Sequence, residues 1–548
     1  MMNRSFFGAL IPVIAFVLIL AGCAQMQIPG GGPRDNSPPK VIKYLPDSGA
    51  RNFSGTGFRI QFDEFISLRD VSGNLIVSPP LEKNPDVKIL KGKTLAVDFN
   101  SPLKPNTTYS FYFGNAIADI REGNVQENFR FVFSTGNYLD SNTISGRVSD
   151  ALTQEAGKGF KVMLFSNPPD ADFQNLKPDY MTKSGPDGSY SLKHTRPGKY
   201  FVLALEDKND DFNYLPGSER VAFSDQLPDT GVNRILNLRY FTELPRKTFA
   251  SSSGLVSSGH YRWTFSRPLG KPDFVFPGIK PSKDTFLLNA GRDTLDYFFK
   301  TPASDFFNVI IKEPTADYLD TFRIFFEKTA ASKKEISFSL QPVFSSPDLK
   351  QSFFSPIVLK SPAPIAGWHF DGEIPEVIWS DKRALHEDAL SFEIGVREIK
   401  LGLENAKGGF PWEPEIDYNL TLLPGIFTDF FGRTNDTLHL KFSTDAPEKY
   451  GTMKWTLELP TGKNFIFQIL GPSGNVVHSG KAGSAWKSGY LKPGSYRARL
   501  IEDTNDNGVW DPGDVVLRKQ PENTIYFPGK IQIRADWDHE EKWKPSGF

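Results

Sequence analysis

The chain has 548 residues, and its 63 Lys and Arg against 64 Asp and Glu give a net charge of −1. That balance offers no basis for nucleic-acid binding or for electrostatic attraction to anionic lipid. A single cysteine excludes a disulfide within the chain. The 47 Phe, 17 Tyr and 9 Trp favour strands, and 46 Gly and 42 Pro are scattered between short runs. The composition predicts an all-β chain of several sandwich modules.

The N-terminus carries a short apolar run, residues 6–20, between Arg4 and the sequence Leu20-Ala21-Gly22-Cys23. Fifteen residues rise about 22 Å as a helix, which is less than the roughly 30 Å of a bilayer's hydrocarbon core. This layout predicts a secretory signal peptide over residues 1–22. Its end resembles a lipobox, which implies cleavage before Cys23, acylation of the thiol (with palmitate, for example) and a lipid anchor. The alternative is an ordinary signal peptide with a chance cysteine.

Residues 23–40 follow as a leader with three successive glycines and four prolines, a composition typical of a flexible spacer. Apolar and polar residues then alternate over residues 58–62, 95–99, 109–113 and 129–133. A period of two over five residues predicts strands with one buried face.

Several motifs in this stretch resemble the bacterial Ig-like domain common in lipoproteins of Bacteroidota. They are Phe62-Asp63-Glu64, Pro105-Asn106-Thr107-Thr108-Tyr109, Glu122-Gly123-Asn124 and Phe133-Ser134-Thr135-Gly136. The resemblance covers roughly residues 30–137 and implies an Ig-like sandwich over 41–137.

A second module is expected over residues 141–240. Its motifs Ser145-Gly146-Arg147-Val148, Gly188-Ser189-Tyr190 and Pro197-Gly198-Lys199-Tyr200 resemble the transthyretin-like or carboxypeptidase-regulatory sandwich. Two internal repeats extend this organisation. Residues 418–444 repeat the spacing of residues 109–135, which predicts an Ig-like module over 361–447, and residues 493–506 repeat residues 197–210, which predicts a transthyretin-like module over 448–540. Residues 241–360 lack a recognisable motif, and we expect a further Ig-like sandwich there.

The loop at residues 503–514 is the strongest candidate site. Oxygen-bearing residues stand at positions 1, 3, 5, 9 and 12, with Gly508 at position 6 for the sharp turn, a pattern typical of a calcium loop. The alternative is a polar hairpin whose side chains bind their own backbone. The predicted ligands are Asp503, Asn505, Asn507, the carbonyl of Val509, Asp511 and Asp514.

The earlier copy of this loop, residues 207–219, departs from the pattern. Phe212 stands at the position of the turn glycine, Leu215 replaces an oxygen ligand, and Glu219 comes one residue late. A structural turn is favoured here over a calcium site.

Catalytic motifs are missing from the sequence: it contains no HExxH, no G-x-S-x-G and no Walker loop. We therefore expect a non-enzymatic protein without a small-molecule substrate or a required cofactor, Ca²⁺ aside. Trp412 and Trp510 are candidates for a carbohydrate platform, although Trp510, within the loop at 503–514, more often caps a local core.

Two functions remain open. The first is an outer-membrane lipoprotein that serves as an interaction or assembly scaffold; the family resemblance implies, as one case, an accessory role beside the machinery that assembles outer-membrane β-barrels. The second is a surface lipoprotein that binds or degrades glycans, with Ig-like modules as spacers. The side of the membrane that the modules face is left open.

Overall fold

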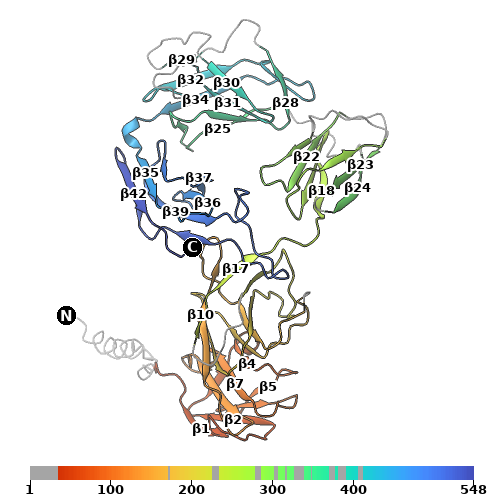
Figure 1. Ribbon diagram of the computed structural model, residues 1–548, viewed down its shortest axis with the longest axis vertical. Helices are drawn as coiled ribbons and strands as arrows, with labels where there is room; N and C mark the ends of the chain where they lie inside the picture. Colours follow the sequence, from red (N-terminus) through yellow and green to blue (C-terminus); the bar gives the residue numbers. More distant parts are fainter. Residues whose placement is uncertain are drawn as a thin grey trace, which may run out of the picture. The chain divides into compact units, whose positions relative to one another are not determined.

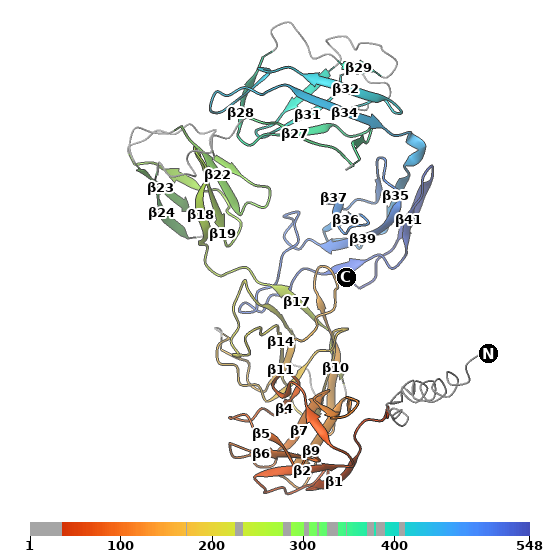
Figure 2. The ribbon, with the colours of Figure 1, turned by 180° about the vertical axis from the view of Figure 1, so that it is seen from behind.

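The computed structural model describes most of the chain after the leader, and Cys23 lies outside the described residues. Contacts divide the chain into two compact units, Met1–Thr143 with Pro178–Thr182 and Leu192–Pro197, and the remainder. The described residues are 35–170, 173–224, 234–277, 286–300, 306–314, 317–325, 338–346, 348–369, 377–379, 390–404 and 411–547. Their regular secondary structure is almost entirely β-strand, which confirms the all-β prediction (Figures 1 and 2).

Module 1 (residues 41–135) is a β-sandwich with its own core. In β2 the side chains of Phe58, Ile60 and Phe62 are buried, whereas Arg59 and Gln61 point away from the core. Strands are confirmed at 58–62, 95–99, 109–113 and 129–133, but the single buried face holds only for the first and the last, because the other two bury consecutive residues such as Leu95, Ala96 and Val97. The sheets are β1 (Val41–Leu45), β2 (Gly57–Phe62), β6 (Thr94–Asp98), β5 (Asp86–Leu90); β4 (Ile76–Ser78), β7 (Thr108–Gly114), β9 (Phe129–Ser134); and β3 (Ile66–Leu68) with β8 (Ile117–Asp119), beside the short helix α2 (Val71–Asn74).

Module 2 (residues 142–243) is built on one eight-stranded sheet. Its central strands β11 and β14 are buried on both faces, so they read as continuous apolar runs rather than as alternations. In order the strands are β12 (Tyr180–Lys183), β11 (Lys161–Phe165), β14 (Phe201–Leu205), β15 (Arg220–Phe223), β17 (Leu238–Thr242), β10 (Asn142–Asp150) and β13 (Ser189–Thr195), with β16 (Arg234–Ile235) on β10.

Module 3 (residues 250–325) has two sheets around a core that contains the fully buried Trp263. If its seven strands are lettered A to G in chain order, they pair as A-B-E-D and C-F-G, the order of an immunoglobulin sandwich. The sheets are β18 (Ala250–Ser257), β19 (His260–Phe265), β22 (Thr294–Phe298), β21 (Phe286–Leu288); and β20 (Asp273–Val275), β23 (Phe306–Glu313), β24 (Tyr318–Phe325).

Module 4 (residues 341–444) repeats the order of the first of these sheets, while its second sheet has a fourth strand and two further strands pair with each other. Strands at 341–360, which the sequence analysis placed in the preceding module, hydrogen-bond to β31 and β34. The sheets therefore divide near residue 340 rather than 360. They are β25 (Gln341–Val343), β27 (Ile357–Lys360), β31 (Glu398–Leu403), β30 (Leu390–Ile394); β26 (Lys350–Gln351), β34 (Leu438–Thr444), β32 (Asp417–Leu422), β29 (Val377–Trp379); and β28 (Ile365–Trp368) with β33 (Phe427–Asp429).

Module 5 (residues 452–543) follows a single turn of 3-10 helix at Pro447–Lys449. Its two sheets enclose Trp455 and Phe467, whose rings lie 5.5 Å apart. The sheets are β38 (Ala485–Lys487), β35 (Thr452–Leu457), β42 (Asp538–Trp543); and β37 (Val476–Lys481), β36 (Phe465–Leu470), β39 (Gly494–Glu502), β40 (Thr524–Tyr526), with β41 (Ile531–Ile533) on β39.

The repeat between residues 109–135 and 418–444 has a structural basis in modules 1 and 4. The hydroxyl of Tyr109 accepts the N–H of Lys104 at 2.8 Å, and that of Tyr418 accepts the N–H of Glu413 at 3.0 Å. Both tyrosines therefore fasten the segment five residues upstream. The repeated residues therefore make equivalent hydrogen bonds in the two modules, in addition to forming equivalent strands.

Asp119 and Asp429 are equivalent in the same two modules and close equivalent turns. Oδ1 of Asp119 accepts the N–H groups of Glu122 and Gly123, and Oδ1 of Asp429 accepts those of Phe431 and Arg433. Burial alone would raise the pKa of Asp119, but these backbone donors outweigh it and lower that pKa. The aspartate of this motif is a turn residue in both modules.

Candidate functional site

The predicted calcium loop leaves β39 at Asp503, whose side chain is almost fully buried. Its Oδ1 accepts the N–H of Asn507 at 3.0 Å, and its Oδ2 accepts the N–H of Gly508 at 2.9 Å. Gly508 has φ +78°, a left-handed conformation that glycine adopts without a steric penalty. The sharp turn predicted at this position is confirmed.

Polar side chains of the loop converge on Asp511. Its Oδ2 accepts the Nδ2 groups of Asn505 at 2.6 Å and of Asn507 at 3.1 Å, while Oδ1 of Asn507 accepts the N–H of Val509. The structure therefore brings together the side chains at positions 3, 5 and 9 of the predicted pattern, whereas the side chain at position 1 binds the backbone of the turn.

Position 12 behaves differently. Oδ1 of Asp514 accepts the N–H of Leu517, and the loop is closed instead by Glu522, which is 3% exposed. Oε1 of Glu522 accepts the N–H and hydroxyl of Thr504, and its Oε2 accepts the N–H of Asp511. The sequence analysis missed Glu522 because it lies beyond the 12-residue pattern.

The earlier copy in module 2 has the same backbone design. Asp207 accepts the N–H groups of Asp211 and Phe212, and Phe212 has φ +58° where the later copy has glycine. Glu219 accepts the N–H groups of Lys208 and Leu215, as Glu522 does at the matching positions. Glu219 and Glu522 are therefore equivalent.

The two loops differ in how their carboxylates are neutralised. In module 2 the ammonium of Lys161 lies 2.5 Å from Asp207 and 2.7 Å from Asp210, with the Phe212 ring 4.0 Å away. The side chains of Lys161 and Asp207 are 4% and 0% exposed. In the described part of module 5, no Lys or Arg forms an ion pair with the loop carboxylates Asp503, Asp511 or Glu522. The ammonium group of Lys161 therefore neutralises the carboxylates of the module 2 loop.

No group of three or more His, Cys, Asp or Glu among the described residues is arranged to hold a metal ion. The module 5 loop offers two aspartates, one glutamate and two asparagine amides. Hard oxygen donors of this kind are the ones that Ca²⁺ takes, six to eight at a time. A calcium site therefore stays a prediction that the donor types fit.

The joint between modules 3 and 4 is made by the buried Asp296. Its Oδ1 lies 2.7 Å from Nε2 of His260 and accepts Nε of Arg262 at 2.7 Å, while Oδ2 accepts Nη1 of Arg397 from module 4 at 3.2 Å. Burial alone would raise the pKa of Asp296, but the hydrogen bonds from His260 and Arg262 hold it well below its ordinary value. One carboxylate thus joins two modules.

Modules 2 and 5 are joined by a docking arm (residues 512–520) that follows the module 5 loop. The guanidinium of Arg518 lies 3.9 Å from the centre of the Phe201 ring, and the N–H of Val515 donates to Glu243 at 3.3 Å. A Cβ on Gly513 would come within 2.6 Å of the Phe241 ring, so this position needs glycine. The arm fastens the last module back onto the second.

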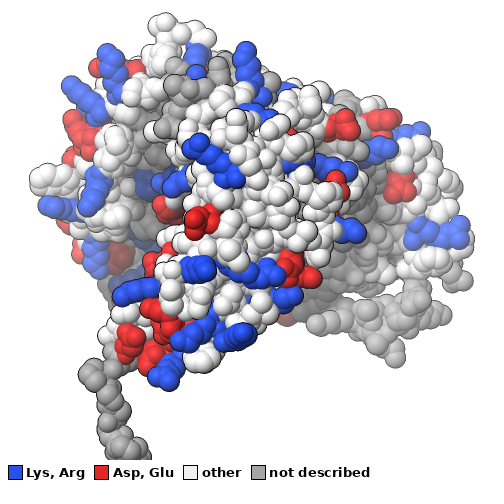
Figure 3. All heavy atoms as spheres, turned by 90° about the horizontal axis from the view of Figure 1, so that it is seen from below, with Lys and Arg blue, Asp and Glu red and all other residues white. Residues whose placement is uncertain are grey.

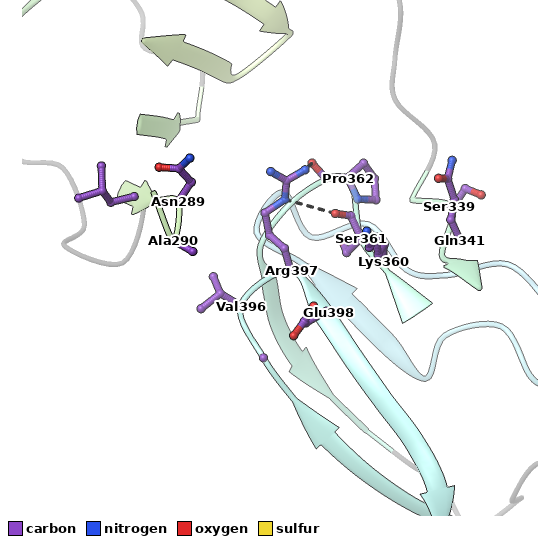
Figure 4. A pocket seen from close by; sticks show the side chains of 12 residues that line it. Asn289, Ala290, Ser339, Gln341, Lys360, Ser361, Pro362, Val396, Arg397 and Glu398 are labelled. Carbon is purple, nitrogen blue, oxygen red and sulfur yellow. Dashed lines mark hydrogen bonds between the residues drawn. The ribbon is translucent and has the colours of Figure 1, made fainter. Parts of the chain in front are cut away.

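A cavity of about 870 Å³ opens between residues 288–290 of module 3 and the β27 and β31 ends of module 4 (Figure 4). Arg397 lies in the wall of the cavity, where it donates to the carbonyl oxygens of Ser361 and Pro362 at 3.3 and 3.1 Å. The lining has no aromatic ring for a sugar to stack on. Trp412 is fully buried, so its predicted exposure as a carbohydrate platform is wrong, and Trp510 donates its indole N–H to the Glu522 carbonyl.

The surface carries both charges side by side. Lysine and arginine alternate with aspartate and glutamate across the face in Figure 3, in line with the near-zero net charge. Within the described residues, no helix is long and apolar enough to cross a membrane.

Comparisons with known proteins give one family and several remote structures. A search of the curated proteins found no match. Similar solved structures include the major pilin subunit BcpA of Bacillus cereus (10% identity, 74% of this chain and 99% of that chain, TM-score 0.13). Another is surface layer protein SbsC, domains 1–6 (11% identity, 90% of this chain and 67% of that chain, TM-score 0.13). A third is the BSP domain of a biofilm associated protein (8% identity, 76% of this chain and 98% of that chain, TM-score 0.16). Scores this low carry no argument about function. The family model that matches is the bacterial Ig-like domain, over residues 35–135, so this part of the chain is an Ig-like domain.

Proposed function

We propose that the chain is a lipid-anchored, non-catalytic scaffold that holds other proteins at the outer membrane. The observation that carries this proposal is the construction of the joints. Asp296 binds Arg397 across one joint, and the docking arm seats Arg518 on Phe201 across another. A row of sandwich modules linked by such side-chain contacts presents large surfaces to partner proteins, which suits an assembly platform.

The anchor and the partner are the finer parts of the proposal. The lipobox resemblance at Cys23 supports acylation, and the Ig-like domain at 35–135 supports an exported protein. The partner is an outer-membrane protein, and an accessory role in β-barrel assembly is the specific form. Cross-linking on intact membranes, followed by purification of the chain, tests it. Recovery of a barrel protein in stoichiometric amount supports the proposal, whereas retention on polysaccharide without a protein partner would favour glycan binding instead.

Replacing Cys23 by serine should release the chain from the membrane. Serine has no thiol to acylate, so the protein should move from the membrane pellet to the soluble fraction and lose the mass of its acyl chains. Fractionation and intact-mass spectrometry measure both. The control is Ser258→Ala, which leaves the N-terminus unchanged. A wild-type chain with an unmodified Cys23 would contradict the anchor.

We also propose that the module 5 loop binds Ca²⁺ through Asp503, Asn505, Asn507, Asp511 and Glu522. Asp503 and Glu522 are buried carboxylates, and a buried charge is costly unless an opposite charge compensates it. In the equivalent loop of module 2, Lys161 supplies that charge. A divalent cation would supply it in module 5.

Trp510 provides a direct readout because it lies within the loop. Terbium should bind in place of Ca²⁺, its luminescence should be sensitised by Trp510, and added Ca²⁺ should quench it. Asp503→Ala should abolish the signal, whereas Asp207→Ala in module 2 should preserve it. At a free Ca²⁺ concentration one hundred times Kd, binding should stabilise module 5 by about 2.7 kcal/mol, seen as slower hydrogen exchange over residues 503–522. Equal hydrogen exchange with Ca²⁺ and with a chelator would contradict calcium binding and favour the alternative, a polar hairpin.

A further inference from the structure

Strand β18 of module 3 has an open edge. It is the first strand of the order β18-β19-β22-β21 and pairs with β19 alone. Between Ser251 and Val256, no described backbone group bonds to anything other than β19. Unpaired N–H and C=O groups along a strand are a template for pairing with another strand.

The composition of β18 distinguishes it from the other edges. Its eight residues, ASSSGLVS, contain neither a charge nor a proline. Every other described edge strand of five or more residues carries a charge, for example Lys43 in β1, Asp320 in β24 and Lys481 in β37. Charged side chains, lysine above all, and proline are the usual devices that prevent edge pairing. In β18 the only such device is an irregular register near each end, which leaves Ser252–Leu255 regular.

We propose that β18 is a self-association edge, where it pairs antiparallel with the β18 of a second copy of this chain. In a twofold antiparallel pair the strand faces its own copy, so a charge close to the twofold axis would lie near the same charge of the second copy. A strand without charges avoids this repulsion, and serine, glycine and alanine allow two sandwiches to approach closely. Pairing also covers Leu255 and Val256, which are 45% and 53% exposed. The product is a continuous sheet of two copies.

A single charge on the edge tests the proposal. The full chain, purified in mild detergent, is expected to sediment as a dimer. Ser252→Lys should weaken the dimer at least tenfold, because each copy would then place a charged lysine on the short paired segment, and lysine on an edge strand opposes pairing. Thr264→Lys is the matched control: Thr264 pairs with Ser252 on the neighbouring strand β19, one strand away from the edge, and should leave the dimer intact. Hydrogen exchange of Ser251–Val256 should be slow in the dimer and fast in the variant.

Other outcomes overturn the proposal. A wild-type chain that stays monomeric at tens of micromolar would do so. So would a dimer that tolerates Ser252→Lys, or one that Thr264→Lys disrupts equally, because either result places the interface elsewhere. Capture of a different protein by β18 in a monomeric chain would show that the edge serves a partner and not a second copy.

Discussion

Replacing Lys161 by methionine should destabilise module 2 by about 3–5 kcal/mol, because it leaves the buried carboxylate of Asp207 without its counter-charge. Both side chains are shielded from water, so solvent cannot compensate for the missing ammonium. Urea unfolding, with hydrogen exchange over β11 and β14 to locate the change, measures the loss. The loop at 207–219 should exchange faster as well, since Asp207 holds two of its N–H groups.

Two further variants show whether the lost stability comes from the unpaired charge of Asp207. Lys481→Met removes a surface pair with Asp506, whose side chains are 65% and 54% exposed, and should change stability by less than about 1 kcal/mol. Adding Asp207→Asn to Lys161→Met removes the orphaned charge and should restore part of the stability. If Lys161→Met alone were neutral, the ammonium would not be what neutralises this loop.

Asp296→Asn should cost about 2–3 kcal/mol, the range for hydrogen bonds to charged groups, since Arg262 and Arg397 then lose their shared carboxylate. The cost should depend on pH. The folded pKa of Asp296 lies below its ordinary value, so its contribution is complete above the unfolded pKa of about 4 and is lost as the pH falls toward the folded value. The wild type and the variant should therefore converge in stability under acid conditions.

Unfolding of both proteins between pH 3 and pH 7 measures this convergence. Glu393→Gln is the control, because Glu393 pairs with Lys400 at the surface, is 73% exposed, and should contribute less than about 1 kcal/mol at any pH. A difference between the wild type and Asp296→Asn that stays constant down to pH 3 would mean that the charge of Asp296 does not matter. Faster exchange limited to β19 and β22, without a change in module 4, would mean that Arg397 adds little.

Local patterns in the sequence predicted much of this fold. Alternation set the strands of module 1, and the spacing from Tyr418 to Thr444 located strands that make the same hydrogen bonds as those of module 1. The loop at 503–514 was located by its turn glycine and oxygen-bearing residues, and Gly508 has the conformation expected.

The parts that the sequence analysis missed depend on contacts between distant residues. Glu522 closes the loop only because the docking arm is inserted before it, and Lys161 reaches Asp207 across the pairing of β11 with β14. A local sequence pattern could predict neither of these two contacts, because their partners lie far apart in the sequence. The predicted boundary between modules 3 and 4 lies at residue 360, whereas strands at 341–360 pair within module 4.

The docking arm also determines how the molecule would bear tension. Because residues 512–520 attach module 5 to module 2, tension applied between these two modules would pass directly through the contacts of the docking arm. Modules 3 and 4 lie between modules 2 and 5 in the sequence, so they would carry no tension until the docking arm detaches. The surfaces of modules 3 and 4 would keep their geometry under mechanical stress, and the Arg518–Phe201 contact would be the first to break.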